Sequence, residues 1–189
     1  MKYLLAVISL ALFAATLVAK DRESAFLSRL YTTPLTASDY IIGYALPILP
    51  IAAAQSVICY GASVLLGLRV TVNLLYAVLF ILPVSLFYIA VGLLCGSVLS
   101  VKQAGSICGA LFTNLSAWMS GTWFDLELMG GAFRRIAYAL PFVHAVELER
   151  TALSGDFSGI LPHLLWVTGY AAVAMVIAVA LFLRQMKRQ

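Results

Sequence analysis

Few side chains in this sequence are of the types that do chemistry, and their spacing gives no catalytic site. Ser63 with His144 or His163 would suit a serine hydrolase, in which a histidine base lies within hydrogen-bond reach of the nucleophile. His144 and Glu147 are three residues apart, share one helical face and can bind metals, but no second pair of ligands accompanies them. A hydrolase therefore stays a minor alternative, and we predict no catalytic, metal-binding or cofactor-binding residue.

A clearer pattern of charged and apolar residues lies within residues 20–40. Phe26, Leu27, Leu30 and Tyr31 recur there at helical spacing, while Arg22, Glu23 and Arg29 occupy other positions around the helix. A helix with one apolar and one charged face is typical of the membrane surface. The segment is therefore predicted to be either a simple connector or a docking surface for another protein.

The composition indicates which elements must position these residues. Of the 189 residues, 63% are hydrophobic and only 11% are charged, whereas soluble domains are about half apolar and a quarter charged. A membrane crossing takes roughly 20 apolar residues, so the chain has room for about five or six crossings and for no separate soluble domain. This excludes an ATPase, a kinase or a nucleic-acid-binding module within the chain.

Five apolar runs predict an all-α membrane protein, because a backbone in lipid must satisfy its hydrogen bonds within each segment. The predicted spans are residues 3–19, 41–66, 74–99, 103–121 and 160–183, within one domain over residues 1–189. Pro47, Pro50 and Pro83 lie inside spans and predict kinks or breaks. The first run could alternatively be a cleaved signal peptide, since a basic residue precedes a short apolar stretch.

The positive charges predict the orientation, because Lys and Arg gather in cytoplasmic connections. If residues 20–40 are inside, seven of the 12 Lys and Arg residues lie in inner segments and five lie outside. The clearest signal is the basic tail that follows the last span, residues 184–189. The N-terminus is therefore predicted to be outside and the C-terminus to be in the cytoplasm.

The outer connection, residues 122–159, mixes aromatic and charged residues in a way typical of a membrane interface. Gly130, Gly131 and Pro141 predict breaks that would divide it into two short helices dipping into the outer leaflet and returning. The segment could act as a gate or simply as an outer cap.

Small residues recur every four positions in the third and fourth predicted spans. Gly92 and Gly96 lie in one, and Gly105 and Gly109 lie in the other. Such faces let helix backbones approach closely in a membrane. We expect these two spans either to pack together as an antiparallel pair or to use one face for a second copy.

No Asp, Glu, Lys or Arg lies deep inside any predicted span. Ion-coupled carriers and proton pumps usually need such groups as relays or ion ligands. The pattern therefore disfavours a proton-driven carrier, and any transport by this chain would draw its energy from another source.

Three segments resemble motifs of ABC-2-type transporter permeases, in the same order and in the same places relative to the spans. Residues 22–35 read R-E-S-A-F-L-S-R-L-Y-T-T-P-L, similar to the family's R-E-x-G-T-L-E-R-L-x-x-T-P-L. Residues 120–128, S-G-T-W-F-D-L-E-L, resemble S-G-x-x-F-P-x-E-x at the end of the family's fifth span. Residues 138–147, Y-A-L-P-F-V-H-A-V-E, are similar to an outer segment that ends in L-P-x-x-x-A-x-E.

The sequence also departs from the family pattern. Ala25, Phe26, Ser28 and Asp125 stand where other residues are usual. The family usually has six spans with both termini inside, whereas this sequence begins at the second span. We therefore expect a permease that lacks the first span, because the sequence is truncated or because another polypeptide supplies that helix. Loss of one helix would also place the N-terminus outside, in agreement with the charges.

The resemblance implies the membrane subunit of an exporter rather than an enzyme. ATP would be bound and hydrolysed by a separate ABC ATPase subunit, and this chain would hold no cofactor. The resemblance also implies a coupling helix over residues 21–31. The residues that would contact the ATPase are Arg22, Glu23, Leu27, Arg29 and Leu30. Two permeases, identical or different, and two ATPases would form the working unit.

The same resemblance implies a multi-pass protein of the plasma membrane, in a prokaryote, with membrane lipid around it and no nucleic-acid partner. The apolar character of the spans favours an amphipathic or lipid-like cargo, such as a drug, a lipid or a glycolipid. A membrane scaffold or assembly subunit without transport activity is the alternative.

Overall fold

The computed structural model describes residues 2–24, 36–68, 70–124 and 126–186, and this described part is helical without a strand. The helices in chain order are α1 (Lys2–Glu23), α3 (Ala37–Leu65), α4 (Val72–Val98), α5 (Val101–Ala104), η1 (Gly105–Phe112), α6 (Thr113–Met119), α7 (Leu126–Met129), α8 (Gly131–Ala139), α9 (Pro141–Ser154) and α10 (Ile160–Met186). The predicted all-α membrane class is confirmed.

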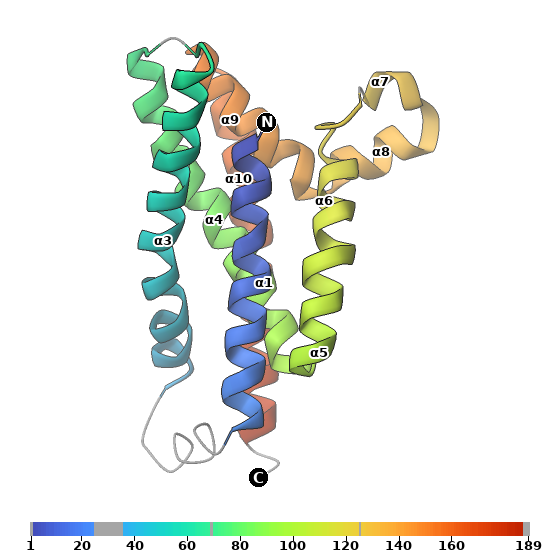
Figure 1. Cartoon of the computed structure of the whole chain (residues 1–189). Coiled ribbons are helices and arrows are strands. Elements are labelled where there is room, and N and C mark those ends of the chain that lie inside the picture. The colour runs from blue at the N-terminus through green and yellow to red at the C-terminus, as the bar shows by residue number, and fades with distance from the viewer. Residues whose placement is uncertain (1, 25–35, 69, 125, 187–189) are drawn as a thin grey trace.

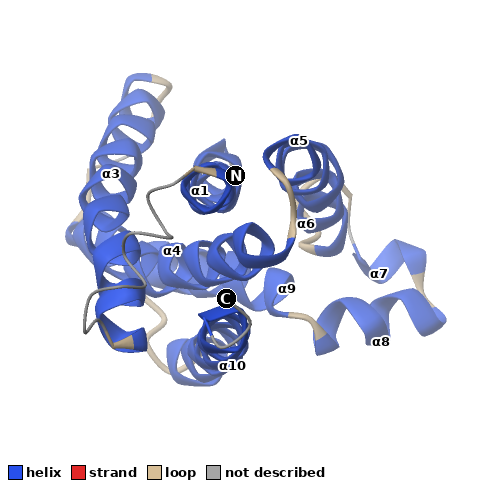
Figure 2. Cartoon of the chain, turned by 90° about the horizontal axis from the view of Figure 1, so that it is seen from below, coloured by secondary structure: helices blue, strands red, loops and turns tan. Residues whose placement is uncertain are grey.

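The long helices run side by side along one axis (Figure 1). Seen from below, α1 lies between α3 and the column of α5 and α6, while α4 separates α1 from α10 (Figure 2). The short helices α7, α8 and α9 gather at one end of this bundle. α9 packs against α4 and α10, so the connection before the last helix is part of the packed structure.

Three of the described helices, α3, α4 and α10, contain an apolar stretch long enough to cross a membrane. α3 begins with a capping box, in which the Thr36 hydroxyl accepts from the Asp39 backbone N–H and the Asp39 carboxylate accepts from the Thr36 backbone N–H at 2.8 Å. α3 and α4 continue through Pro47, Pro50 and Pro83 without a break. Length and composition therefore outweigh the prolines here.

The fourth predicted span is not one regular helix, because α5 and α6 are joined by the eight-residue π-helix η1. A π-helix shifts the backbone hydrogen bonds by one residue and leaves the regular pattern at its end. There the Thr113 hydroxyl donates to the Cys108 carbonyl at 3.1 Å, and the Asn114 amide donates to the Ala110 carbonyl at 2.7 Å. Two polar side chains thus satisfy backbone carbonyls where the helix type changes.

The glycines of α4 bring its backbone against α1. A Cβ added at Gly92 would lie 2.6 Å from the Ala11 carbonyl oxygen, and one added at Gly96 would lie 2.7 Å from the Ala15 carbonyl oxygen. Ala11 and Ala15 are themselves fully buried at this contact. The two helices can approach this closely because neither has a side chain beyond Cβ at these positions.

The partner of this glycine face is α1 and not the fourth predicted span. Gly109 of η1 faces the Leu12 side chain of α1 at 3.5 Å, an ordinary contact, and Gly105 has no atom within 4 Å of an added Cβ. α1 therefore lies between the two helices that we expected to pair. The reason is that α1 carries its own stripe of alanines, which fits the glycine face of α4.

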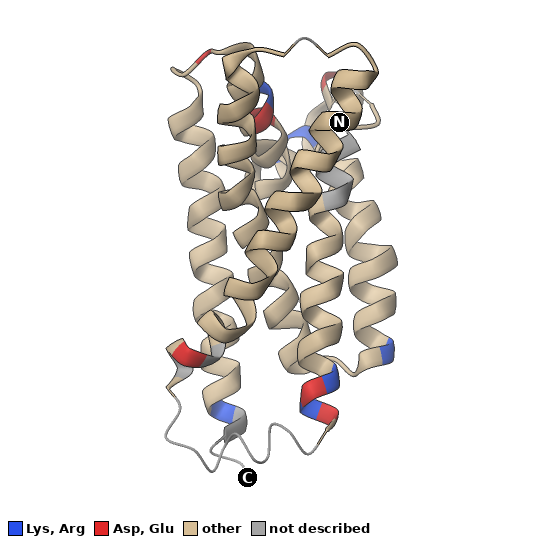
Figure 3. Cartoon of the chain, turned by 60° about the vertical axis from the view of Figure 1, so that its left-hand side comes forward, with Lys and Arg blue, Asp and Glu red and all other residues tan. Residues whose placement is uncertain are grey.

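Charged residues gather at the two ends of the bundle (Figure 3). We call the end formed by the last turn of α1, the start of α5 and the last turn of α10 the inner end, following the predicted orientation. α1 continues to Glu23, so the predicted inner segment, residues 20–40, begins as its last turn. The outer segment breaks near Gly130 and Pro141 and holds three helices rather than two.

Replacing Gly92 or Gly96 with alanine should weaken the fold, because the new methyl group would collide with the α1 backbone. We expect each change to lower the free energy of unfolding by about 1–3 kcal/mol, the usual cost of overpacking. Thermal unfolding of the detergent-purified protein, followed by circular dichroism, measures this. Gly105→Ala is the matched control, since nothing lies near its Cβ. Equal melting temperatures for Gly96→Ala and Gly105→Ala would contradict the packing.

Candidate functional site

The residues predicted to couple the chain to an ATPase divide into two groups. Leu27, Arg29 and Leu30 lie outside the described residues. Arg22 and Glu23 lie in the last turn of α1, where both take part in polar contacts within the chain. The structure therefore shows what the first two residues bind in this chain and leaves the other three as a sequence-based expectation.

Three consecutive residues, Asp21, Arg22 and Glu23, connect the end of α1 to three other helices, and we call them the inner cluster. The Asp21 carboxylate accepts a hydrogen bond from the Tyr44 hydroxyl of α3 at 2.7 Å. The Arg22 guanidinium donates to two backbone carbonyls at the end of α4, those of Ser97 and Leu99. The Glu23 carboxylate accepts from the Val101 backbone N–H at the start of α5, at 3.0 Å.

The charges of the inner cluster match the helix ends that they contact. The last carbonyls of a helix carry partial negative charge and lack partners within the helix, which favours a cation there. The first N–H groups carry partial positive charge, which favours an anion. Arg22 at the end of α4 and Glu23 at the start of α5 therefore hold the turn between these helices from both sides.

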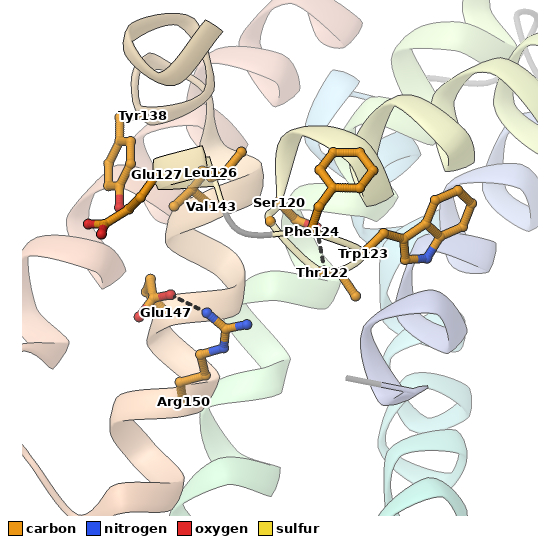
Figure 4. A pocket seen from close by; sticks show the side chains of 11 residues that line it. Ser120, Thr122, Trp123, Phe124, Leu126, Glu127, Tyr138, Val143, Glu147 and Arg150 are labelled. Carbon is orange, nitrogen blue, oxygen red and sulfur yellow. Dashed lines mark hydrogen bonds and ion pairs between the residues drawn. The ribbon is translucent and has the colours of Figure 1, made fainter. Parts of the chain in front are cut away.

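A cavity of about 400 Å³ lies at the outer end, between the end of α6 and helices α7, α8 and α9 (Figure 4). It brings together the two outer motifs of the sequence. Residues 120–128 contribute Ser120, Thr122 and Trp123, and residues 138–147 contribute Tyr138 and Glu147. We call it the outer pocket. Segments that are separate in the sequence thus meet because α8 folds back and returns the chain to α9.

The walls of the outer pocket combine aromatic rings with charges of both signs. Glu147 and Arg150 of α9 form an ion pair of 2.7 Å, and Glu127 lies 3.6 Å from Arg134 of α8. These groups are partly exposed, so water screens the pairs and each contributes little to stability. Such pairs exchange partners easily. The pocket can therefore offer a positive group, a negative group and a ring surface to one ligand.

Two histidines connect α9 to α10 beside this pocket. The Nδ1 atoms of His144 and His163 are 2.8 Å apart, and the His144 Nε2 atom lies 3.0 Å from the Tyr138 carbonyl. The His144 ring stacks on Trp166 with a centroid distance of 5.0 Å. His144 is therefore held by a carbonyl, a second imidazole and an indole ring.

The hydrogen bonds of His144 identify which nitrogen carries the proton in its neutral form. A carbonyl only accepts, so the proton of neutral His144 is on Nε2, and its Nδ1 accepts from the Nδ1–H of His163. Burial lowers the pKa of His144 from its ordinary value of 6.5, and the nearby His163 acts in the same direction. A second proton on His144 would lie on Nδ1 and would require His163 to become the acceptor, with its own proton moved to Nε2.

The residues considered for hydrolysis or metal binding have other partners. The Ser63 hydroxyl donates to the Cys59 carbonyl of its own helix at 2.8 Å. Within the described ranges no group of three or more His, Cys, Asp and Glu side chains is placed to hold a metal ion. His144 bonds His163 while Glu147 bonds Arg150. The described geometry gives these two hypotheses no support.

Sequence reasoning missed a buried carboxyl group, that of Glu149 on α9. Its residue is 0% exposed, and its Oε2 atom lies 2.5 Å from the Tyr60 hydroxyl of α3. A signal was present, because Glu149 follows the buried Ala145 by four residues and precedes the buried Ala152 by three, on the apolar face of α9. The sequence pattern places it only among the charged residues of the outer connection, residues 122–159.

The comparisons with known proteins give one match. The sequence family described as "ABC-2 family transporter protein" matches residues 2–180, which is nearly the whole chain. No curated protein and no solved structure matches the chain significantly. The match covers the inner cluster, the outer pocket and most of the last helix.

Arg22→Gln and Glu23→Gln should each loosen the turn between α4 and α5, because a charged partner of a helix end is lost. We expect a loss of about 1 kcal/mol or less in each, since the Arg22 contact is partly buried and the Glu23 contact is exposed. Trypsin cleavage after the exposed Lys102 of α5 gives a local readout and should become faster. Lys20→Gln is the control. Unchanged cleavage in both variants would contradict the role given to the inner cluster.

The contact of α9 with α10 should weaken in acid. Because the pKa of His144 is lowered in the folded protein, its contribution to stability is present above about pH 6.5 and is lost as the pH falls further. Between pH 6.5 and about pH 5, we expect the wild-type melting temperature to fall by roughly 2–4 °C relative to His144→Phe, which keeps a ring but does not titrate. Parallel pH profiles for the two proteins would show the interpretation to be wrong.

Proposed function

The chain belongs to the ABC-2 family of transporter proteins, and from this premise we propose that it exports an amphipathic or lipid-like cargo with energy from a separate ATPase subunit. Membership makes it a membrane component of an ABC transporter. Export as the direction, the class of cargo and the ATPase are the parts that we propose.

The observation that carries this proposal is the inner cluster. Asp21, Arg22 and Glu23 are the first residues of the segment, 21–31, that the family resemblance assigns to ATPase contact, and they bind α3, α4 and α5. A force applied to that segment would act on three helices through neighbouring residues. The cluster would thereby transmit a movement of the ATPase to most of the bundle.

Charge placement supports an external source of energy. α4 carries no charged residue, and the charged residues of α3 and α10 lie at their inner ends. Among the described parts of these helices there is thus no chain of ionisable groups of the kind that ion-coupled carriers use. ATP hydrolysis by a partner supplies the energy in this proposal.

The outer pocket supports an amphipathic cargo. A ligand with an apolar body and a polar or charged end would find rings at Trp123 and Tyr138 and charges at Glu147 and Arg150. The pocket lies at the end where a cargo moving outward would leave the bundle. We place a release site there.

In the working unit we propose two permease chains, identical or different, with two ATPases. The protein would span the plasma membrane of a prokaryotic cell, surrounded by lipid, with its C-terminus in the cytoplasm. Exposed apolar side chains along α3, α6 and α10 provide surface for lipid and for the second permease.

The test is purification of the tagged chain from its native membrane, followed by identification of bound proteins. We expect an ATPase with a Walker motif to co-purify and to hydrolyse ATP in the complex. Arg29→Glu combined with Leu30→Asp should lower the bound ATPase at least about tenfold, because a charge reversal and a buried charge would disrupt a docking face. Arg134→Glu with Arg135→Glu, at the outer end, should leave binding unchanged. Equal ATPase binding by both double variants would argue against the proposal.

A further inference from the structure

Glu149 is the most deeply buried ionisable group in the outer segment. The residue is 0% exposed, and its Oε2 atom accepts a hydrogen bond of 2.5 Å from the Tyr60 hydroxyl. Its Oε1 atom has no hydrogen-bond partner among the described residues. A carboxylate has about four acceptor sites, and a buried charge with one donor is poorly compensated. The geometry therefore suits the neutral acid.

The charges around Glu149 do not favour ionisation strongly. α4 has no charged residue, and those of α3 and α10 are at the inner end. The titratable group that α3 brings to Glu149 is Tyr60, and the one that α10 brings to α9 is His163, which bonds His144. On α9 itself, Glu147 and Arg150 pair with each other. Among the described residues, the Tyr60 hydrogen bond favours the carboxylate.

Burial therefore dominates the titration of this group. It raises the pKa of Glu149 from 4.5 to about 8, and the hydrogen bond from Tyr60 offsets part of that rise. Glu149 thus carries a proton at neutral pH. An ionised Glu149 would need a donor or a cation at Oε1, and no described side chain or backbone group supplies one.

Besides its packing against α4 and α10, α9 makes one polar contact with each of three long helices. Near its start, His144 bonds His163 of α10. Near its end, the Asn73 amide of α4 donates to the Leu153 carbonyl at 3.2 Å. Between them, Glu149 bonds Tyr60 of α3. In the contact with α3 the Tyr60 hydroxyl donates, so the bond itself does not need a proton on Glu149, whereas the burial of the carboxyl group there favours the neutral acid.

We propose that a proton on the buried Glu149 carboxyl group keeps α9 docked on α3. Release of this proton frees α9 from α3 and opens the outer pocket. The pocket is affected because Glu147 and Arg150, on the same helix, line it. A movement of α9 away from α3 changes their positions relative to Trp123 and Glu127. Alkaline pH at the outer surface thus favours the open pocket.

The direction of the effect follows from linkage. Since the pKa of docked Glu149 lies above the ordinary value, docking is fully favoured below about pH 4.5 and weakens as the pH rises through about 8. The undocked helix releases one proton. The docking equilibrium constant therefore falls by up to about tenfold per pH unit across that interval.

Labelling with dicyclohexylcarbodiimide tests whether Glu149 is protonated, because this apolar reagent reacts with protonated carboxyl groups in apolar surroundings. In the full-length protein in lipid nanodiscs, we expect residue-level mass spectrometry to find Glu149 labelled at pH 7 and labelling to disappear above about pH 9. Glu147, which is partly exposed on the same helix and paired with Arg150, is the internal control and should stay unlabelled. In Tyr60→Phe the midpoint should move to higher pH, because a donor to the carboxylate is lost. Absence of label on Glu149 at pH 7 would overturn the proposal.

A distance measurement tests the docking itself. Spin labels at Ala62 of α3 and Ser154 of α9, both exposed, are introduced after replacement of Cys59, Cys95 and Cys108. We expect one distance at about pH 6 and a second, longer distance that grows as the pH rises through about 8. Glu149→Gln, which keeps the shape but cannot ionise, should hold the short distance throughout, and Glu147→Gln should behave as wild type. An identical pH response in wild type and Glu149→Gln would disprove the mechanism.

The docking equilibrium is a property of α9, whereas its effect on cargo release rests on the proposed function. Neither the labelling nor the distance measurement requires cargo or an ATPase. Loss of the pH response with intact ATPase binding would reject the proton-dependent contact alone. The opposite result, a pH response without any bound ATPase, would reject the proposed function and leave the contact in place.

Discussion

The backbone contact of α1 with α4 is the constraint on which the rest of the bundle depends. Gly92 and Gly96 remove the side chains that would keep the helices apart, and the alanines of α1 complete the close fit. Because lipid gives helices little hydrophobic reason to associate, such packing must supply much of the attraction. With α1 fixed on α4, its last turn lies where Asp21, Arg22 and Glu23 reach three other helices.

The two ends of the molecule handle charge in opposite ways. At the inner end, ionised groups meet the complementary ends of helices, where partial charges and access to water make an ion inexpensive to keep. Around α9, the buried contacts are between neutral groups, namely a protonated carboxyl with a phenol and two imidazoles that share one hydrogen. The contacts of α9 therefore respond to pH, through Glu149 and His144.

Much of the architecture is visible in the hydrophobic pattern. The long apolar runs coincide with α1, α3, α4 and α10, and the breaks near Gly130 and Pro141 separate the outer helices. The resemblance of three segments to ABC-2 permease motifs predicted the family, and the match over residues 2–180 confirms it. The sequence pattern predicted the helices themselves but not which helices pack against each other. Spacing identified the glycine face of α4, but sequence neighbours suggested the wrong helix for it, because an alanine stripe on α1 is a less obvious signal.

The sequence by itself determined the membrane class, the family and the separation of charge to the two ends, because hydrophobicity, motif order and residue type are local properties. Only the tertiary structure decided that α1 lies between α4 and η1, that residues 120–128 and 138–147 share one pocket, and that Glu149 is buried while Glu147 is partly exposed. The two glutamates are chemically identical and two positions apart. Their difference arises from which face of α9 packs against the bundle, and that packing excludes water from one carboxyl group and leaves the other solvated.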